Sequence, residues 1–135
     1  MSSNKPDSTP NWNLVDSCAW IEYFMGSPAS AQYDAPICDL DNLIVPTISL
    51  MEVYKFLQKN CGIQDARRAV GVMREGLVLP LDEDIALLAA DLSISEKLAA
   101  ADAIIYATAQ SHNALLWTQD EHFSGKPGVK FFKKP

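Results

Sequence analysis

Residues 12–25 read WNLVDSCAWIEYFM, a short and mostly apolar run that ends at an acidic residue and leads at once into a second apolar segment. Residues 12–15 predict a buried strand, and residues 17–25 predict a helix that stops at Gly26-Ser27-Pro28. A strand that passes directly into a helix is the first part of a βαβ unit. This stretch therefore predicts a parallel α/β fold.

The rest of the chain repeats this order of strand and helix. Further strands are expected over residues 43–45, 77–79, 114–117 and 129–132, and further helices over residues 31–40, 48–60, 64–75, 84–93 and 100–111. Gly76 stands where a C-cap glycine of the 64–75 helix is expected. Right-handed crossovers between such strands place helices on both faces of a largely parallel, five-stranded sheet.

Length and composition limit the possible classes of protein. The chain has 135 residues, enough for one domain, expected over residues 13–135 after a flexible lead-in at residues 1–12. Seventeen acidic against eleven basic residues give a formal charge of −6, which disfavours long-range attraction to nucleic acid or anionic membranes. Three unpaired cysteines and the absence of a long apolar stretch predict a soluble, cytoplasmic protein without disulfides or a membrane span.

Four carboxylates stand near the expected carboxyl ends of strands or the starts of helices. They are Asp16, Glu52, Asp102 and Asp120. Ligands of open parallel sheets bind at this edge of the sheet, so the four side chains are expected to converge there. No Arg or Lys neighbours them closely enough in sequence to neutralise all four, and a shared divalent cation would relieve their repulsion. Oxygen ligands of this kind favour Mg²⁺ or Mn²⁺.

Three of these carboxylates also have purely structural interpretations. Asp16 can cap the helix that follows it, and Asp120 can be a turn residue. Asp102 can cap a helix that begins at Ala103, although its apolar neighbours make an unpaired charge costly to bury.

Glu52 has two structural alternatives of its own. With Ser49 it forms the S-x-x-E pattern of a capping box, which would explain both residues without a ligand. It also precedes Lys55 by three residues, the spacing of an ion pair on a helix surface.

Four blocks of sequence, in this order, resemble the PIN domain and, more narrowly, the VapC-type ribonuclease toxins. They are Val15-Asp16-Ser17 with the Ala19–Phe24 segment AWIEYF, Ile48-Ser49-x-x-Glu52, the run ADAIIYATA from residue 101, and Thr118-x-Asp120-x-x-Phe123. The resemblance implies a three-layer α/β/α sandwich with a central, mainly parallel five-stranded sheet. It also implies metal-dependent cleavage of RNA.

The resemblance further implies roles for single residues and partners. Asp16, Glu52, Asp102 and Asp120 would be catalytic metal ligands for Mg²⁺ or Mn²⁺, with Ser17 and Thr118 as supporting hydroxyls. A cognate antitoxin protein, a homodimer and an RNA substrate would be the partners. The chain departs from some family members at His122, which stands where they carry a further Asp.

Basic residues are the candidates for contacting RNA phosphates. They are Lys55, Lys59, Arg67, Arg68, Arg74, Lys126, Lys130, Lys133 and Lys134. Two other functions stay open at this point. One is a catalytically weak interaction module that binds an antitoxin-like partner, and the other is a phosphotransfer domain with Asp82, which follows the third strand, as its acceptor.

Overall fold

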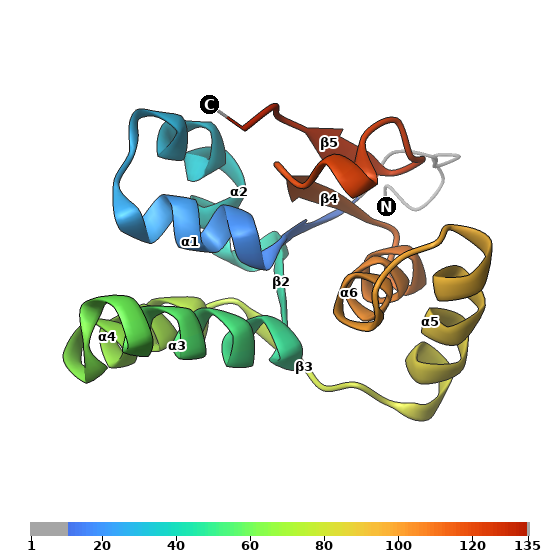
Figure 1. Ribbon diagram of the computed structural model, residues 1–135, viewed down its shortest axis with the longest axis horizontal. Coiled ribbons are helices and arrows are strands. Elements are labelled where there is room, and N and C mark those ends of the chain that lie inside the picture. The colour runs from blue at the N-terminus through green and yellow to red at the C-terminus, as the bar shows by residue number, and fades with distance from the viewer. Residues whose placement is uncertain (1–10, 135) are drawn as a thin grey trace.

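A computed structural model describes residues 11–134 of the chain (Figure 1). Its strands are β1 (Trp12–Val15), β2 (Leu43–Pro46), β3 (Leu77–Leu79), β4 (Ala114–Thr118) and β5 (Val129–Phe131). Its α-helices are α1 (Ser17–Met25), α2 (Asp34–Cys38), α3 (Thr47–Cys61), α4 (Ile63–Met73), α5 (Glu83–Ser95) and α6 (Ala100–Ser111). Most of the expected lead-in, residues 1–10, lies outside the described residues, and Trp12 already belongs to β1.

The five strands form one parallel sheet in the order β3-β2-β1-β4-β5. The chain first builds the sheet from β1 toward β3 and then crosses back to place β4 on the other side of β1. The strand order therefore reverses between β1 and β4, where Val15 pairs with Trp117. A ligand crevice is expected beyond the carboxyl ends of these two strands.

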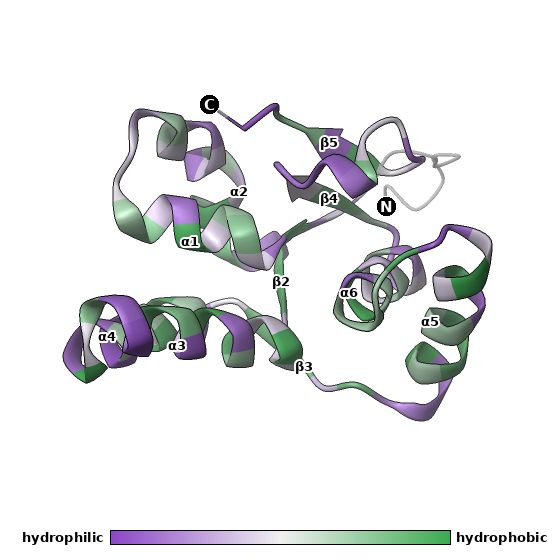
Figure 2. Ribbon diagram, viewed as in Figure 1, coloured by the Kyte–Doolittle hydropathy of each residue, from purple (hydrophilic) through white to green (hydrophobic). Residues whose placement is uncertain are grey.

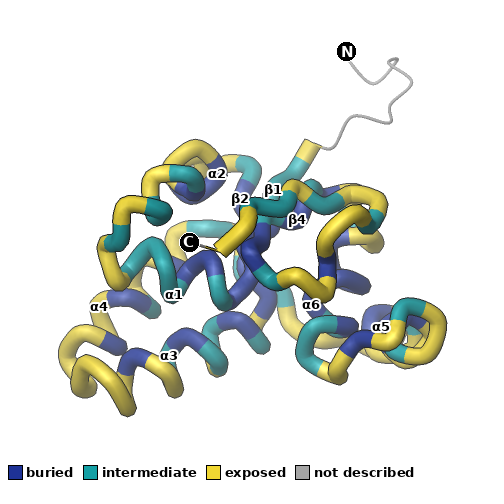
Figure 3. The backbone as a smooth tube through the Cα atoms, turned by 45° about the horizontal axis from the view of Figure 1, so that its top comes forward, coloured by how far each residue is buried: buried dark blue, intermediate teal, exposed yellow. Residues whose placement is uncertain are grey.

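Helices cover both faces of the sheet, which confirms the expected sandwich (Figures 1 and 3). Leu14, Ile44 and Leu116 face α5 and α6, whereas Val15 and Val45 face the layer of α1 to α4. This alternation follows from the two-residue period of a strand. Figure 2 accordingly shows hydrophobic residues along β2 and hydrophilic residues on much of α4. Within residues 11–134, no helix combines the length and apolarity that a bilayer span requires.

The expected helix over residues 31–40 is wrong in form. The structure has a 3₁₀ helix at Pro28–Tyr33, the short α2, and a second 3₁₀ turn at Leu40–Asn42. Pro36 lacks the N–H that a helix continuing from residue 31 would need to bond back to Gln32, so the segment divides into shorter pieces.

Gly76 is not the C-cap of α4, so that expectation is also wrong. The helix ends at Met73 with Arg74 as its C-cap, and Gly76 does not have a positive φ. A Cβ at Gly76 would instead lie 3.0 Å from the carbonyl oxygen of Leu43 and 3.1 Å from Cγ2 of Val45. Glycine is favoured here because the chain that enters β3 passes close against β2.

Candidate functional site

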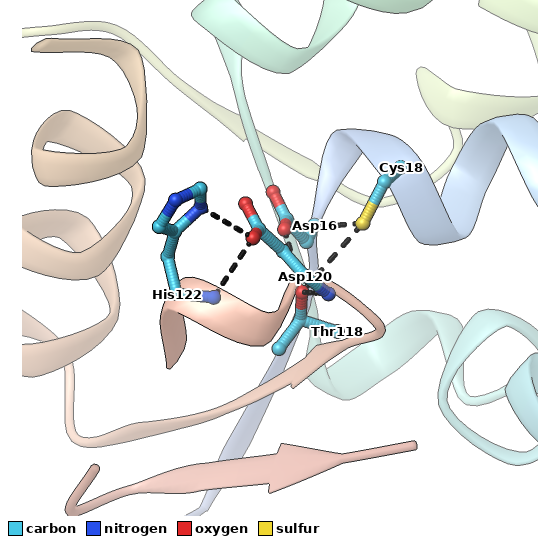
Figure 4. Close-up of polar contacts among 5 residues, drawn as sticks. All are labelled: Asp16, Cys18, Thr118, Asp120 and His122. Carbon is cyan, nitrogen blue, oxygen red and sulfur yellow. Dashed lines mark hydrogen bonds and ion pairs between the residues drawn. The ribbon is translucent and has the colours of Figure 1, made fainter. Parts of the chain in front are cut away.

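Asp16 lies at the carboxyl end of β1, where the strand order reverses, and only 3% of it is exposed. Its Oδ1 accepts a hydrogen bond from the Ser17 backbone N–H at 2.8 Å. Asp16 is therefore the N-cap of α1, as its structural interpretation predicts. Its Oδ2 accepts the Thr118 hydroxyl at 2.7 Å and the Cys18 thiol at 3.3 Å (Figure 4). Burial raises the pKa of Asp16 against the lowering effect of these hydrogen bonds.

Thr118 joins the ends of β1 and β4. While its hydroxyl donates to Asp16, the same oxygen accepts the Asp120 backbone N–H at 3.0 Å (Figure 4). Asp120 in turn caps a 3₁₀ turn, η4 (Glu121–Phe123), by accepting the His122 backbone N–H at 2.9 Å. The expected turn role of Asp120 is therefore present, and it directs the carboxylate beside His122.

Asp102 lies in the first turn of α6, whose N-cap is Ala99. The expectation that Asp102 caps a helix beginning at Ala103 is therefore wrong. No hydrogen bond joins the Asp102 side chain to any other residue that the structure describes. Burial, with the nearby charges of Asp16 and Asp120, raises the pKa of Asp102 to about 6.

Glu52 reaches the same region from α3, where its Oε1 accepts the Ser17 hydroxyl at 2.7 Å. The capping-box interpretation is wrong, because α3 begins at Thr47 and Ser49 lies inside its first turn, fully buried. The expected pair with Lys55 is also missing from the ion pairs of residues 11–134. Ser17 thus supports Glu52, while Thr118 supports Asp16.

The four carboxylates line one pocket of about 570 Å³. Its walls also carry the side chains of Lys55, Lys59 and Phe56 from α3. The complete lining is Asp16, Ser17, Cys18, Ile21, Met51, Glu52, Lys55, Phe56, Lys59, Asn60, Asp102 and Asp120. Acidic groups from β1, α6 and β4 therefore meet a wall on α3 that contains two lysines.

The donor set of this pocket fits a hard divalent cation. Within the described part of the chain, no Lys or Arg forms an ion pair with any of the four carboxylates. Their mutual repulsion is visible at Asp102, where the charges of all three other carboxylates act to raise the pKa. Carboxylate and hydroxyl oxygens are the ligands that Mg²⁺ and Mn²⁺ prefer. The role of these residues as metal ligands stays a prediction.

Three of the other candidate basic residues have partners elsewhere. Lys126 pairs with Glu96 at 2.7 Å, Arg68 pairs with Asp65, and Lys130 lies over the Trp117 ring. Arg67 and Arg74 line a different hollow, between α3 and α4. Of the basic residues expected to contact phosphates, Lys55 and Lys59 are the two that line the carboxylate pocket.

The structure also corrects the phosphotransfer alternative and adds residues to the site. Asp82 caps α5 by accepting the Ile85 N–H at 2.9 Å and follows the edge strand β3, far from the reversal point. Cys18 and Phe56 line the pocket but carried no signal in the sequence. Burial raises the pKa of the Cys18 thiol to about 12, so it is a neutral hydrogen-bond donor to Asp16.

Residues 14–128 match the family model of the PIN domain. The fold is similar to that of a toxin–antitoxin complex from Klebsiella pneumoniae, with a TM-score of 0.76, 29% identity, and 90% of this chain and 99% of that chain covered. No curated protein matches in a sequence search.

Two more distant structures share the fold. VapC20 of Mycobacterium tuberculosis, described as a sarcin-ricin loop cleaving toxin, has a TM-score of 0.71 and 16% identity, with 84% of this chain and 94% of that chain covered. DNA-bound VapBC of Salmonella typhimurium has a TM-score of 0.69 and 18% identity, with 90% of this chain and 97% of that chain covered.

Proposed function

The chain belongs to the PIN domain family, and from this premise we propose that it is a metal-dependent endoribonuclease that acts as the toxin of a toxin–antitoxin pair. One observation carries the proposal. Four segments that are far apart in sequence bring Asp16, Glu52, Asp102 and Asp120 to one pocket at the point where the strand order reverses. Within residues 11–134 none of these acidic groups forms an ion pair with a Lys or Arg, and such a set is costly to maintain unless it serves a cation.

The residues of the pocket divide the work between holding a cation and orienting its ligands. Asp16 is fixed by the Ser17 N–H and the Thr118 hydroxyl, so its carboxylate enters the site in one orientation. The Ser17 hydroxyl donates a hydrogen bond to Oε1 of Glu52, and Oε2 of Glu52 has no hydrogen-bond partner among the described residues. A bound Mg²⁺ or Mn²⁺ supplies an activated water and stabilises the charge that develops on the scissile phosphate and the leaving oxygen.

The α3 wall supplies the proposed contacts to substrate. Lys55 and Lys59 are four residues apart and both line the pocket, so their ammonium groups can hold phosphates on either side of the scissile bond. Phe56, the residue after Lys55, also lines the pocket and is 38% exposed, which offers a ring on which an unpaired base can stack. These features favour a single-stranded or looped RNA, because paired bases would not be free to stack.

The proposed partners follow from the similar structures. The Klebsiella and Salmonella proteins are both complexes of a toxin with an antitoxin, which supports a cognate antitoxin for this chain. A homodimer is proposed from the family resemblance alone.

The test is cleavage of an end-labelled RNA that contains unpaired segments. Wild-type protein is expected to give discrete fragments with Mn²⁺ or Mg²⁺ and none in excess EDTA. Asp16→Asn should lose cleavage, whereas the matched variant Asp82→Asn, whose carboxylate caps α5 outside the pocket, should keep it. Undiminished cleavage in EDTA or by Asp16→Asn would refute the proposal. A wild-type protein that cleaves no RNA even with Mn²⁺ or Mg²⁺, but binds an antitoxin tightly, would favour an interaction module instead.

A further inference from the structure

His122 lies at the edge of the carboxylate pocket and has no part in the function proposed so far. One ligand atom from each of Asp102, Asp120 and His122 can be chosen so that all three lie within 4.8 Å of one another. Among the described residues, these three form a group whose ligand atoms are close enough together to hold one metal ion. One of the three potential ligand atoms is a nitrogen, from the imidazole of His122. The sequence has two histidines, of which the other, His112, ends α6.

The backbone holds the His122 ring beside the carboxylates. Asp120 accepts the His122 N–H at 2.9 Å, and its same Oδ1 lies 2.8 Å from Nδ1 of the ring (Figure 4). Phe123, the next residue, is fully buried against Tyr106 with ring centroids 5.6 Å apart. The turn that carries His122 is therefore anchored, although the histidine side chain is 73% exposed.

The spacing of these atoms is close to that of ligands around one ion. Ligands at about 2.1 Å from an octahedral cation lie about 3.0 Å apart when adjacent and about 4.2 Å apart when opposite. Oδ1 of Asp120 and Nδ1 of His122 are joined by a hydrogen bond of 2.8 Å, which is close to the adjacent spacing, so a cation that replaces the shared proton would find both atoms near ligand distance. The chosen atoms of Asp102, Asp120 and His122 all lie within 4.8 Å of one another, so small side-chain rotations would bring the three to the separations of ligands around one ion.

We propose that His122 is a ligand of the cation held by Asp102 and Asp120, and that its nitrogen makes the site select Mn²⁺ over Mg²⁺. This inference rests on the proposed function. Mg²⁺ is bound through oxygen and keeps its waters, whereas imidazole is a good ligand for first-row transition ions. A neutral ring also adds a lone pair without adding negative charge to a pocket that already contains four carboxylates.

The experiment measures Mn²⁺ directly by electron paramagnetic resonance, with Mg²⁺ as competitor. Pulsed spectra of the wild-type complex should show coupling to an imidazole ¹⁴N. His122→Ala should lose this coupling and weaken Mn²⁺ binding by about tenfold or more, the cost of removing a residue that holds or orients a metal ligand. Mg²⁺ affinity should change less, and His122→Asp should shift the preference toward Mg²⁺.

His112→Ala is the matched control. Its ring contacts the Thr108 carbonyl at the end of α6 opposite to Asp102, so the ¹⁴N coupling and both affinities should stay as in wild type. Bound Mn²⁺ without ¹⁴N coupling in the wild type, or an unchanged ratio of Mn²⁺ to Mg²⁺ affinity in His122→Ala, would overturn the role of His122 and leave the carboxylate site standing. Failure of the wild type to bind Mn²⁺ at all would overturn both.

Discussion

Replacing Asp102 by Asn should make the metal-free protein more stable, although it removes a residue proposed to bind the cation. Asp102 has no hydrogen bond among the described residues, and burial and the charges of Asp16, Asp120 and Glu52 raise its pKa from 3.8 to about 6. Between these two values the unfolded chain has released a proton that the folded protein still holds. The free energy of unfolding therefore falls as pH rises through this window and stays reduced at neutral pH.

The size of the effect follows from the two pKa values. A difference between 3.8 and about 6 corresponds to about 3 kcal/mol at neutral pH, an upper bound. Partial exposure of Asp102 screens the repulsion, and the carboxylate also interacts favourably with the N-terminus of α6, so the net gain on substitution is about 1 kcal/mol. For a domain of this length that is a rise in Tm of about 3–5 °C.

Thermal unfolding monitored by circular dichroism tests this reasoning. In EDTA at pH 7.5, Asp102→Asn should unfold at a higher temperature than wild type, and the difference should shrink near pH 4, where the carboxyl of the folded protein is neutral. Added Mn²⁺ should stabilise the wild type more than the variant and reduce or reverse the order. A variant that is no more stable than wild type in EDTA at pH 7.5 would refute the claim that Asp102 is held under repulsion.

Other substitutions test the packing, the ligand support and the RNA contact. Gly76→Ala should cost about 1–3 kcal/mol of unfolding free energy because its Cβ meets β2, whereas Gly71→Ala, with open space around it, should be neutral or stabilising; equal denaturant midpoints would contradict this. Thr118→Val should lower the free energy of unfolding by about 1–3 kcal/mol and weaken Mn²⁺ binding, because it removes the hydrogen bond to Asp16. Thr108→Val loses only a hydrogen bond within α6 and should leave Mn²⁺ affinity unchanged; equal Mn²⁺ affinities of the two variants in calorimetric titration would contradict this. Lys59→Gln should weaken RNA binding and reduce the slope of log K against log salt by about one, and an unchanged slope would remove Lys59 from the phosphate contacts.

Local sequence patterns predicted the strands well because each is a short apolar run between turn residues. All five runs became strands, with ends that differ by one residue or less. The expected helix over residues 31–40 is wrong because Pro36, although visible in the sequence, divides the segment into two 3₁₀ pieces and the short α2. Gly76 was misassigned because a glycine after a helix is usually a cap, and its contact with Leu43 is visible only in three dimensions.

The carboxylates could be identified from the sequence because the ends of parallel strands meet at one edge. Their supports are harder to predict: the bond from Thr118 to Asp16 joins residues 102 positions apart. Ser49 with Glu52 matches a capping box, yet the N-cap of α3 is Pro46, three residues earlier than that pattern requires. The closeness of His122 to Asp102 depends on how α6 packs, which the spacing to Asp120 alone does not reveal.

Anomalous diffraction from crystals grown with Mn²⁺ tests most directly whether these carboxylates act as one cation site. We predict a strong anomalous peak within about 2.2 Å of carboxylate oxygens of Asp102 and Asp120, in the pocket that Asp16 and Glu52 also line. The peak should disappear in the Asp102→Asn protein. A pocket without Mn²⁺ at concentrations that support RNA cleavage, or a peak bound elsewhere on the chain, would contradict the account.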